Sequence, residues 1–266
     1  MAKKLKKEES NGLFDIICTP PKVFLIDYSV FVHRSIFAWR NQKGQIPATY
    51  YCLNSIFTCL KKLKPKKDDL IIIALDSYGK GNWRRDYDPA YKANRKESRD
   101  KQDDIDWGKE FEAMNVLINN IHLSTPFIPI QVDRLEADDI ISYACRHYTD
   151  RAKIILTTDS DMNQLYSLGN VKVYSPVTKK FREVKHPLRE LAKKIQKEAT
   201  DNLITPITNQ AEYERRKTIV SLLQLPDEVE APLKKIFANL KPKNEYYPEK
   251  IMFQSLIEKY NNLYGE

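Results

Sequence analysis

The sequence predicts an α/β fold in which a mostly parallel central sheet is flanked by helices, followed by a C-terminal helical part. Two observations lead to this fold class. Short runs of almost only apolar, often β-branched residues alternate with longer segments whose apolar residues recur every three or four positions. Beyond about Glu190 the strand-like runs stop while the helical periodicity continues. Strands that are apolar on both faces are typical of parallel sheets covered by helices on each side.

The individual elements follow from these patterns. The runs predicted as strands are residues 22–27, 70–76, 127–132, 153–158 and 171–175. Three helices are predicted between them, with apolar faces formed by Ile46, Tyr50, Leu53, Phe57 and Leu60, by Phe111, Met114, Leu117, Ile118 and Ile121, and by Ile140, Ile141, Ala144 and His147. The C-terminal part reads as helices separated at Pro226, Pro242 and Pro248.

The composition narrows the function classes. A net charge of +8 favours an anionic partner, with nucleic acid first among them. No segment approaches the roughly 20 apolar residues that span a bilayer, and no apolar signal core follows the basic N-terminus, so we expect no membrane association and a cytoplasmic location. Scattered histidines and cysteines without a CxxC pair argue against zinc, and seven glycines in the whole chain argue against a glycine-rich phosphate loop.

Acidic residues gather at the ends of three predicted strands and at the start of one predicted helix. Those at the strand ends are Asp27, Asp76, Asp159 and Asp161, and those in the helix start "LEADDII" are Glu136, Asp138 and Asp139. Ligands of open parallel sheets bind outside the carboxyl ends of the strands. We therefore expect all of these side chains at the same rim of the sheet.

Each acid also has an ordinary explanation. Acidic residues are favoured at helix N-termini, and Asp161 could be a helix N-cap with Gln164 three residues later. Taken together, however, about seven like charges at one rim would repel by several kcal/mol unless a cation neutralised them. Oxygen-only ligands suit Mg²⁺ or Mn²⁺, and two such ions roughly 3.5–4 Å apart hydrolyse phosphodiesters. A basic protein with an acidic metal site is the pattern expected of a nuclease.

Four sequence blocks occur in an order that resembles the 5′-nuclease superfamily. They are "FLIDYSVFVHRS", "ALDSYGKGNWRRDYDPAYKANRK", "RLEADDIIS" and "LTTDSDMNQL", and they cover roughly residues 22–176. This superfamily comprises flap endonucleases, the 5′-exonuclease domain of bacterial DNA polymerase I and phage 5′-exonucleases. The later segment "YERRKTIVSLLQLPDEV" is similar to the RNase H branch of T-even phages. The resemblance therefore also suggests a phage origin.

The resemblance implies two metal ions. One would be held by Asp27, Asp76, Glu136 and Asp138 with Asp139 close by, and the other by Asp159, Asp161, Glu198 and Asp201. The segment "QKEATDNLITPI" matches the last acidic pair of the family imperfectly, because Glu198 stands where the family has Asp. The glycines that present backbone amides to duplex phosphates are also missing here. We therefore expect an altered helix-turn-helix.

The resemblance also assigns the basic residues after the second strand to a helical gateway for a single-stranded 5′ end. The residues expected to bind nucleic acid are Arg34, Arg84, Tyr91, Lys92 and Arg95, of which Arg84, Lys92 and Arg95 would also serve catalysis. Tyr28 could likewise stack on a base. The alternative for the stretch is a solvated charged loop.

The sequence and the resemblance together predict three regions of the chain and one enzymatic activity. We expect a disordered basic tail over residues 1–20, a nuclease core over 21–185 with its gateway near 80–108, and a helical part with altered duplex binding over 186–266. The expected substrates are DNA with a 5′ flap or single-stranded 5′ end and RNA–DNA hybrids, in primer removal or flap processing during replication. We expect a monomer in the host cytoplasm that works beside proteins such as a single-strand-binding protein. The alternatives are a PIN-like ribonuclease and a non-catalytic nucleic-acid-binding homologue.

Overall fold

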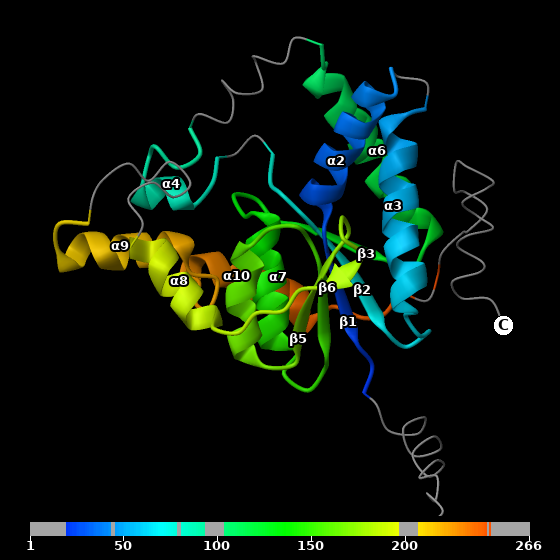
Figure 1. Ribbon diagram of the computed structural model, residues 1–266. Coiled ribbons are helices and arrows are strands. Elements are labelled where there is room, and N and C mark those ends of the chain that lie inside the picture. Colours follow the sequence, from blue (N-terminus) through cyan, green and yellow to red (C-terminus); the bar gives the residue numbers. More distant parts are fainter. Residues whose placement is uncertain are drawn as a thin grey trace, which may run out of the picture.

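The computed structural model describes residues 20–43, 46–78, 81–93, 104–196, 207–243 and 245. Its centre is a sheet with the strand order β3-β2-β1-β4-β5-β6, in which the first five strands are parallel and β6 is antiparallel to β5 (Figure 1). The strands are β1 (Val23–Asp27), β2 (Leu70–Leu75), β3 (Ile128–Gln131), β4 (Lys153–Leu156), β5 (Val171–Ser175) and β6 (Lys180–Phe181). The predicted fold class is confirmed. Strand β6 was not predicted, because a strand of two exposed residues is too short to show a hydrophobic pattern.

Three helices cover one face of the sheet: α2 (Tyr28–Asn41), α3 (Ala48–Leu63) and α6 (Trp107–Ser124) (Figure 1). Helix α2 begins directly where β1 ends, and it buries Phe31, Val32, Ser35 and Ile36. Helix α2 was not predicted from the sequence patterns, because the aromatic and β-branched residues at its start also suit a strand.

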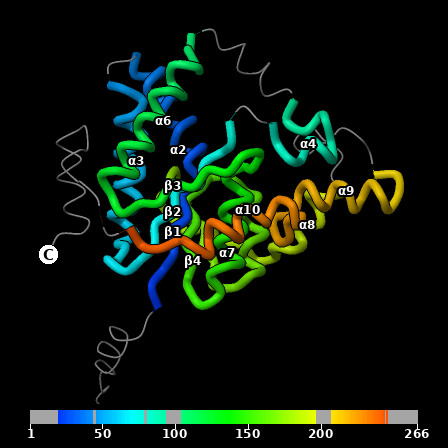
Figure 2. The backbone as a smooth tube through the Cα atoms, turned by 180° about the vertical axis from the view of Figure 1, so that it is seen from behind, coloured from blue at the N-terminus to red at the C-terminus, as the bar shows by residue number. Residues whose placement is uncertain are grey.

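The opposite face packs against α7 (Ala137–His147), α10 (Asp227–Ala238) and the 3₁₀ helix η1 (Asp161–Leu168). Three further helices, α4 (Arg84–Tyr87), α8 (Pro187–Gln196) and α9 (Gln210–Val220), extend to one side of the sheet. Short helix α4 lies beside α9 in both views, although far from it in the sequence (Figures 1 and 2). This contact joins α9 to the segment that follows β2.

Buried polar contacts fix the C-terminal helices to the sheet layer. The side-chain amide of Gln164 donates to the carbonyl oxygen of Val220 at 3.3 Å and accepts from the amide of Leu222 at 2.7 Å. The hydroxyl of Ser142 in α7 also donates to the carbonyl oxygen of Leu222. Satisfying these buried groups favours one docking position, since an unpaired buried amide would cost about 1–3 kcal/mol. Within the described residues, no helix combines the length and apolar character needed to cross a membrane.

Candidate metal centre

The acidic residues lie at the carboxyl rim of the sheet, as the strand pattern predicts. Asp27 is the last residue of β1 and is only 2 % exposed, while Asp76 follows β2 directly. Asp159 follows β4, the strand paired with β1 on its other side. The backbone amide of Ala137, at the start of α7, donates to Oδ1 of Asp76 at 2.8 Å. This bond holds the acidic start of α7 against the end of β2.

Asp27 lies at the centre of this group. Its two carboxylate oxygens accept hydrogen bonds from Ser29 Oγ at 2.8 Å and from Thr157 Oγ1 at 2.7 Å. Burial, followed by the negative charges of Asp76 and Asp159, nevertheless raises the pKa of Asp27 to about 6. The two hydroxyls therefore orient the carboxylate without neutralising it.

Asp138 is subject to the same repulsion between carboxylates. Burial comes first, followed by the negative charges of Asp159 and Asp27, and together they raise the pKa of Asp138 well above its usual value. The charge of Lys92 offsets only part of this effect. We call Asp27, Asp76, Asp138 and Asp159 the open half of the rim, because repulsion among carboxylates dominates there.

The open half has the donor chemistry of a site for a hard divalent cation. All four side chains offer carboxylate oxygens, which Mg²⁺ and Mn²⁺ prefer, and a cation among them would relieve their repulsion. In the part of the chain that the structure describes, no three acidic, histidine or cysteine side chains are grouped closely enough to enclose an ion alone. In protein sites Mg²⁺ usually keeps several water ligands and is bound directly by only one or two carboxylates.

Glu136 and Asp139 form the other part of the rim, which we call the paired half. The Arg84 guanidinium binds Asp139 with both terminal nitrogens, at 2.7 and 3.1 Å, and also reaches Glu136 at 3.1 Å. The indole of Trp83 donates to Asp139 at 3.0 Å, and Asp139 also accepts from the backbone amide of Glu136 at 2.9 Å. Asp139 is fully buried and bound from several sides. Its surroundings suit a structural ion pair better than a metal ligand.

The gateway expectation needs correction at two residues. Arg84 is 2 % exposed, and its Nε donates to the carbonyl oxygen of Ile219 at 2.9 Å. With every guanidinium nitrogen engaged by protein oxygens, Arg84 does not face a phosphate. The Tyr91 ring is also buried, with its hydroxyl 3.1 Å from Glu136, and Tyr28 is buried with its hydroxyl bound to the Met114 carbonyl oxygen. Neither tyrosine is placed to stack on a base.

Lys92 also reaches the rim, and unlike Arg84 and Tyr91 it is only partly buried. Its ammonium lies 2.7 Å from Glu136 Oε1 and 4.9 Å from the centre of the Tyr91 ring. Burial alone would raise the pKa of Glu136, but the charges of Lys92 and Arg84 and hydrogen bonds from Lys92 and Tyr91 lower it to about 2. Arg34 is exposed on α2. Arg95 lies outside the described residues.

Asp159 and Asp161 differ in their surroundings. The amide of Asp161 donates to Asp159 Oδ1 at 2.8 Å, and Ser160 is the N-cap of η1. The alternative of Asp161 as N-cap with Gln164 is therefore wrong, because Asp159 binds the backbone there and Gln164 binds Val220 and Leu222. Asp161 instead forms an ion pair with Lys194 of α8. The expected ligands Glu198 and Asp201 lie outside the described residues.

Several contributors were not found by sequence reasoning. These are Ser29 and Thr157 at Asp27, Trp83 at Asp139, Lys194 at Asp161, and Arg182, which donates to the carbonyl oxygens of Thr158 and Asp159. Hydroxyl residues next to strand-end acids are a signal that could have indicated Ser29 and Thr157. Lys194 and Arg182 come from elements distant in the sequence, so no local sequence pattern indicates their contacts with Asp161 and Asp159.

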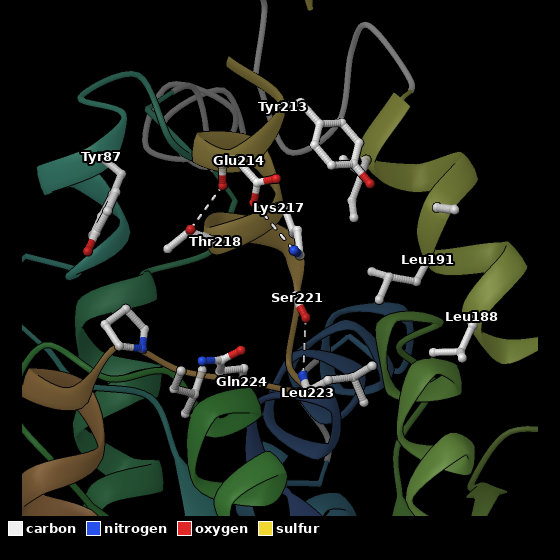
Figure 3. Close-up of a pocket in the computed structure, with 14 residues that line it drawn as sticks. Tyr87, Leu188, Leu191, Tyr213, Glu214, Lys217, Thr218, Ser221, Leu223 and Gln224 are labelled. Carbon is white, nitrogen blue, oxygen red and sulfur yellow. Dashed lines mark hydrogen bonds and ion pairs between the residues drawn. The ribbon is translucent and has the colours of Figure 1, made fainter. Parts of the chain in front are cut away.

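The C-terminal part contains a groove where the sequence predicts altered duplex binding. It has a volume of about 540 Å³ and lies between α8, α9 and the loop that follows α9, with Tyr87 of α4 at its rim (Figure 3). Leu191 and Leu188 line one wall, and Leu188 is 56 % exposed. The charged side chains in its lining, Glu214 and Lys217, form an ion pair at 3.3 Å. This lining offers no net charge to a phosphate backbone.

Comparison with known proteins adds the family. The family model described as the 5′-3′ exonuclease, N-terminal resolvase-like domain, matches residues 22–198. Ribonuclease H of Enterobacteria phage T4 is 33 % identical over 141 residues, a match that covers 52 % of this chain and 46 % of that protein. The chain therefore matches about half the length of this relative.

Solved structures share the fold at low identity. The T5 protein co-crystallised with metal ions has a TM-score of 0.54 at 16 % identity, covering 91 % of this chain and 88 % of that one. The bacteriophage T5 flap endonuclease in a complex with DNA and metal ions has a TM-score of 0.55 at 16 % identity, covering 91 % and 87 %. At this identity the likeness extends to the fold.

Proposed function

The chain belongs to the family of the 5′-3′ exonuclease N-terminal, resolvase-like domain, and from this premise we propose that it is a divalent-metal-dependent 5′-nuclease. Its reaction is the hydrolysis of phosphodiester bonds at 5′ ends or flaps of DNA, or in RNA primers paired with DNA. One observation above all supports this: the open half gathers the buried carboxylate of Asp27 with three partly buried ones, and burial followed by their mutual repulsion raises the pKa values of Asp27 and Asp138.

The proposed cofactor is Mg²⁺ or Mn²⁺, with two ions in the working enzyme. Asp27, Asp76, Asp138 and Glu136 would hold one ion, and Asp159 and Asp161, together with Glu198 and Asp201 outside the described residues, would hold the other. Bound metal lowers the pKa of water and stabilises the charge that develops on the leaving oxygen. The hydroxyls of Ser29 and Thr157 orient Asp27, and the Ala137 amide orients Asp76. Asp139 and Arg84 position the acidic start of α7.

Lys92 is proposed to contact the substrate phosphate. It is the cation nearest to Glu136, and an ammonium donates readily to a phosphate oxygen. A metal ion held by Glu136 would compensate this carboxylate, and the ammonium of Lys92 would then be able to contact the phosphate. Arg95 and the exposed Arg34 are proposed to bind the strand farther from the reaction.

The substrate class rests on charge and on relatives. The net charge of +8 suits a nucleic acid, one relative is named a ribonuclease H, and one structural neighbour is titled as a complex with DNA. We propose primer removal or flap processing in replication as the setting. A monomer in the host cytoplasm, and work beside a single-strand-binding protein, stay predictions. The division into a core over 21–185 and a duplex-binding part over 186–266 is likewise proposed, as a division of roles, since both parts share one apolar core.

A labelled 5′-flap DNA, incubated with Mg²⁺, with Mn²⁺ and with EDTA, tests the proposal. We expect short labelled products with either metal and none with EDTA. An RNA-primed DNA duplex in parallel decides the substrate preference. Cleavage of single-stranded RNA alone would favour the PIN-like alternative, and binding of the flap without metal-dependent cleavage would favour the non-catalytic one.

A further inference from the structure

A second cavity lies beside the open half, beyond the end of β2. It has a volume of about 380 Å³, within the usual range for small-ligand sites. Apolar Leu75 and Ile118 contribute to its lining. Its polar lining consists of Ser77, Tyr78, Asn115, Asn119, Gln131 and Asp133. The cavity is thus bounded by the end of β2, by α6 and by the segment that follows β3.

The polar lining matches the edge of a flat, uncharged group. Asn115 and Asn119 lie one turn apart on α6, both are exposed, and within the described residues neither side chain has a hydrogen-bond partner in the structure. Each amide offers two donors and one acceptor. The lining holds one carboxylate, Asp133, and no cation. A phosphate would therefore be disfavoured, while a nucleobase edge presents the donors and acceptors that amides bind.

An exposed aromatic ring completes the cavity. Tyr78 is 46 % exposed, and its ring is packed on Phe111 of α6 with the ring centres 5.9 Å apart. Phe111 therefore supports Tyr78 from within the protein and leaves part of the ring exposed. Aromatic side chains in such positions stack on unpaired bases.

We propose that this cavity is a base pocket that receives one unpaired nucleobase of the substrate strand, stacked on Tyr78 and bound at its edge by Asn115 and Asn119. The inference rests on the proposed function and extends it. The pocket is connected to the candidate centre, because Ser77 follows Asp76 in the chain and the Gln131 amide donates to the Asp76 carbonyl oxygen at 2.7 Å. A base held there fixes the strand at a set distance from Asp76. The pocket thereby helps to choose which phosphodiester is cut.

An abasic scan of the flap tests this pocket. Binding of a fluorescent 5′-flap DNA is measured by anisotropy with Ca²⁺ in place of Mg²⁺, first with all bases present and then with one base removed at each position in turn. For the wild-type protein we expect removal at one position to weaken binding roughly five- to 150-fold, the range of one lost base–aromatic stack.

Two variants should abolish this position dependence. Tyr78→Ala and the double variant Asn115→Ala with Asn119→Ala should bind the intact flap more weakly, and base removal at the sensitive position should then have no further effect. Tyr78→Phe should keep most of the wild-type penalty because it keeps the ring. Val116→Ala is the matched control, since Val116 is exposed on the same helix outside the cavity. Unchanged melting temperatures exclude misfolding.

The outcomes separate the two proposals. A wild-type protein that cuts the flap with Mg²⁺ but shows no penalty at any position, or the same penalty in the variants, would overturn the base pocket alone. A wild-type protein that neither binds nor cuts the flap would overturn the proposed function and the pocket with it. Addition of free nucleosides distinguishes a strand base from a soluble ligand: competition at micromolar nucleoside would contradict a strand base as the occupant.

Discussion

The two halves of the acidic rim are built from the same residue types but have opposite electrostatics. Glu136 and Asp138 are two residues apart at the start of α7, and burial acts on both. The pKa of Glu136 is nevertheless lowered to about 2, while that of Asp138 is raised well above its usual value. Glu136 faces Lys92 and Arg84, whereas Asp138 faces Asp159 and Asp27. The neighbouring charges, not burial, decide the difference.

This contrast indicates what each half does. In the paired half the protein supplies its own cations, so the carboxylates are ordered and hold α4, α7 and α9 together. In the open half the nearest charges are mostly negative, and we propose that a divalent cation neutralises them. Removing a carboxylate of the open half should therefore leave stability unchanged or higher, whereas removing one partner of the ion pairs in the paired half should lower it.

The largest effect is expected in the open half. Asp27→Asn should reduce metal-dependent cleavage by roughly a thousand-fold or more, since bound metal contributes several kcal/mol to such reactions. The metal-free variant should be as stable as the wild type or more stable, because one repelling charge is gone; Asp159→Asn should behave alike. Initial rates and urea unfolding in EDTA measure the two quantities. Loss of activity together with a large loss of stability would assign these residues to the fold.

The opposite result is expected in the paired half. Arg84→Met should lower the free energy of unfolding by about 3–5 kcal/mol, because it leaves the buried Asp139 carboxylate unpaired. Urea unfolding measures this loss. Arg189→Met, an exposed arginine on α8, is the matched control and should be nearly neutral. If Arg84→Met instead left stability unchanged and only weakened substrate binding, the original phosphate-binding expectation would be restored.

A smaller effect is expected at Lys92, the proposed contact to the substrate phosphate. Lys92→Ala should weaken flap binding about ten-fold and reduce the slope of log K against log salt by about one unit, as for one lost phosphate contact. Binding is measured by anisotropy from low to moderate salt, with the exposed Lys61→Ala as control. Combining Lys92→Ala with Arg95→Ala should reduce the slope further. An unchanged slope together with full activity would show that the basic stretch containing Lys92 and Arg95 is a solvated loop.

The smallest effect is expected at Glu198 and Asp201, the proposed further ligands of the second ion. Glu198→Gln removes a charge at nearly constant shape, so the Mg²⁺ concentration for half-maximal rate should rise several-fold, as for a ligand partly replaced by water. Asp201→Asn should raise it at least as much, whereas Glu198→Asp should stay partly active. Metal titrations of the cleavage rate measure these shifts. Wild-type Mg²⁺ dependence in both Glu198→Gln and Asp201→Asn would restrict the second ion to Asp159 and Asp161.

The sequence by itself determined the fold class and the position of the acids. Apolar runs and helical periodicity are local patterns, and parallel strands bring their carboxyl ends to one rim, so Asp27, Asp76 and Asp159 could be placed there in advance. The start of α7 at the "EADD" segment was also readable, because the preference of acids for helix N-termini is local.

Only the tertiary structure decided which carboxylates are neutralised by a nearby cationic side chain. Arg84 and Asp139 are 55 residues apart, and Lys194 meets Asp161 from a different helix, so no spacing in the sequence indicates either pair. The same holds for Tyr78 and Asn115, which come to one cavity from the segment after β2 and from α6. Local patterns specify an element and its buried face. The direction of each charged side chain depends on how distant elements pack, and this packing separates the neutralised carboxylates from those that repel.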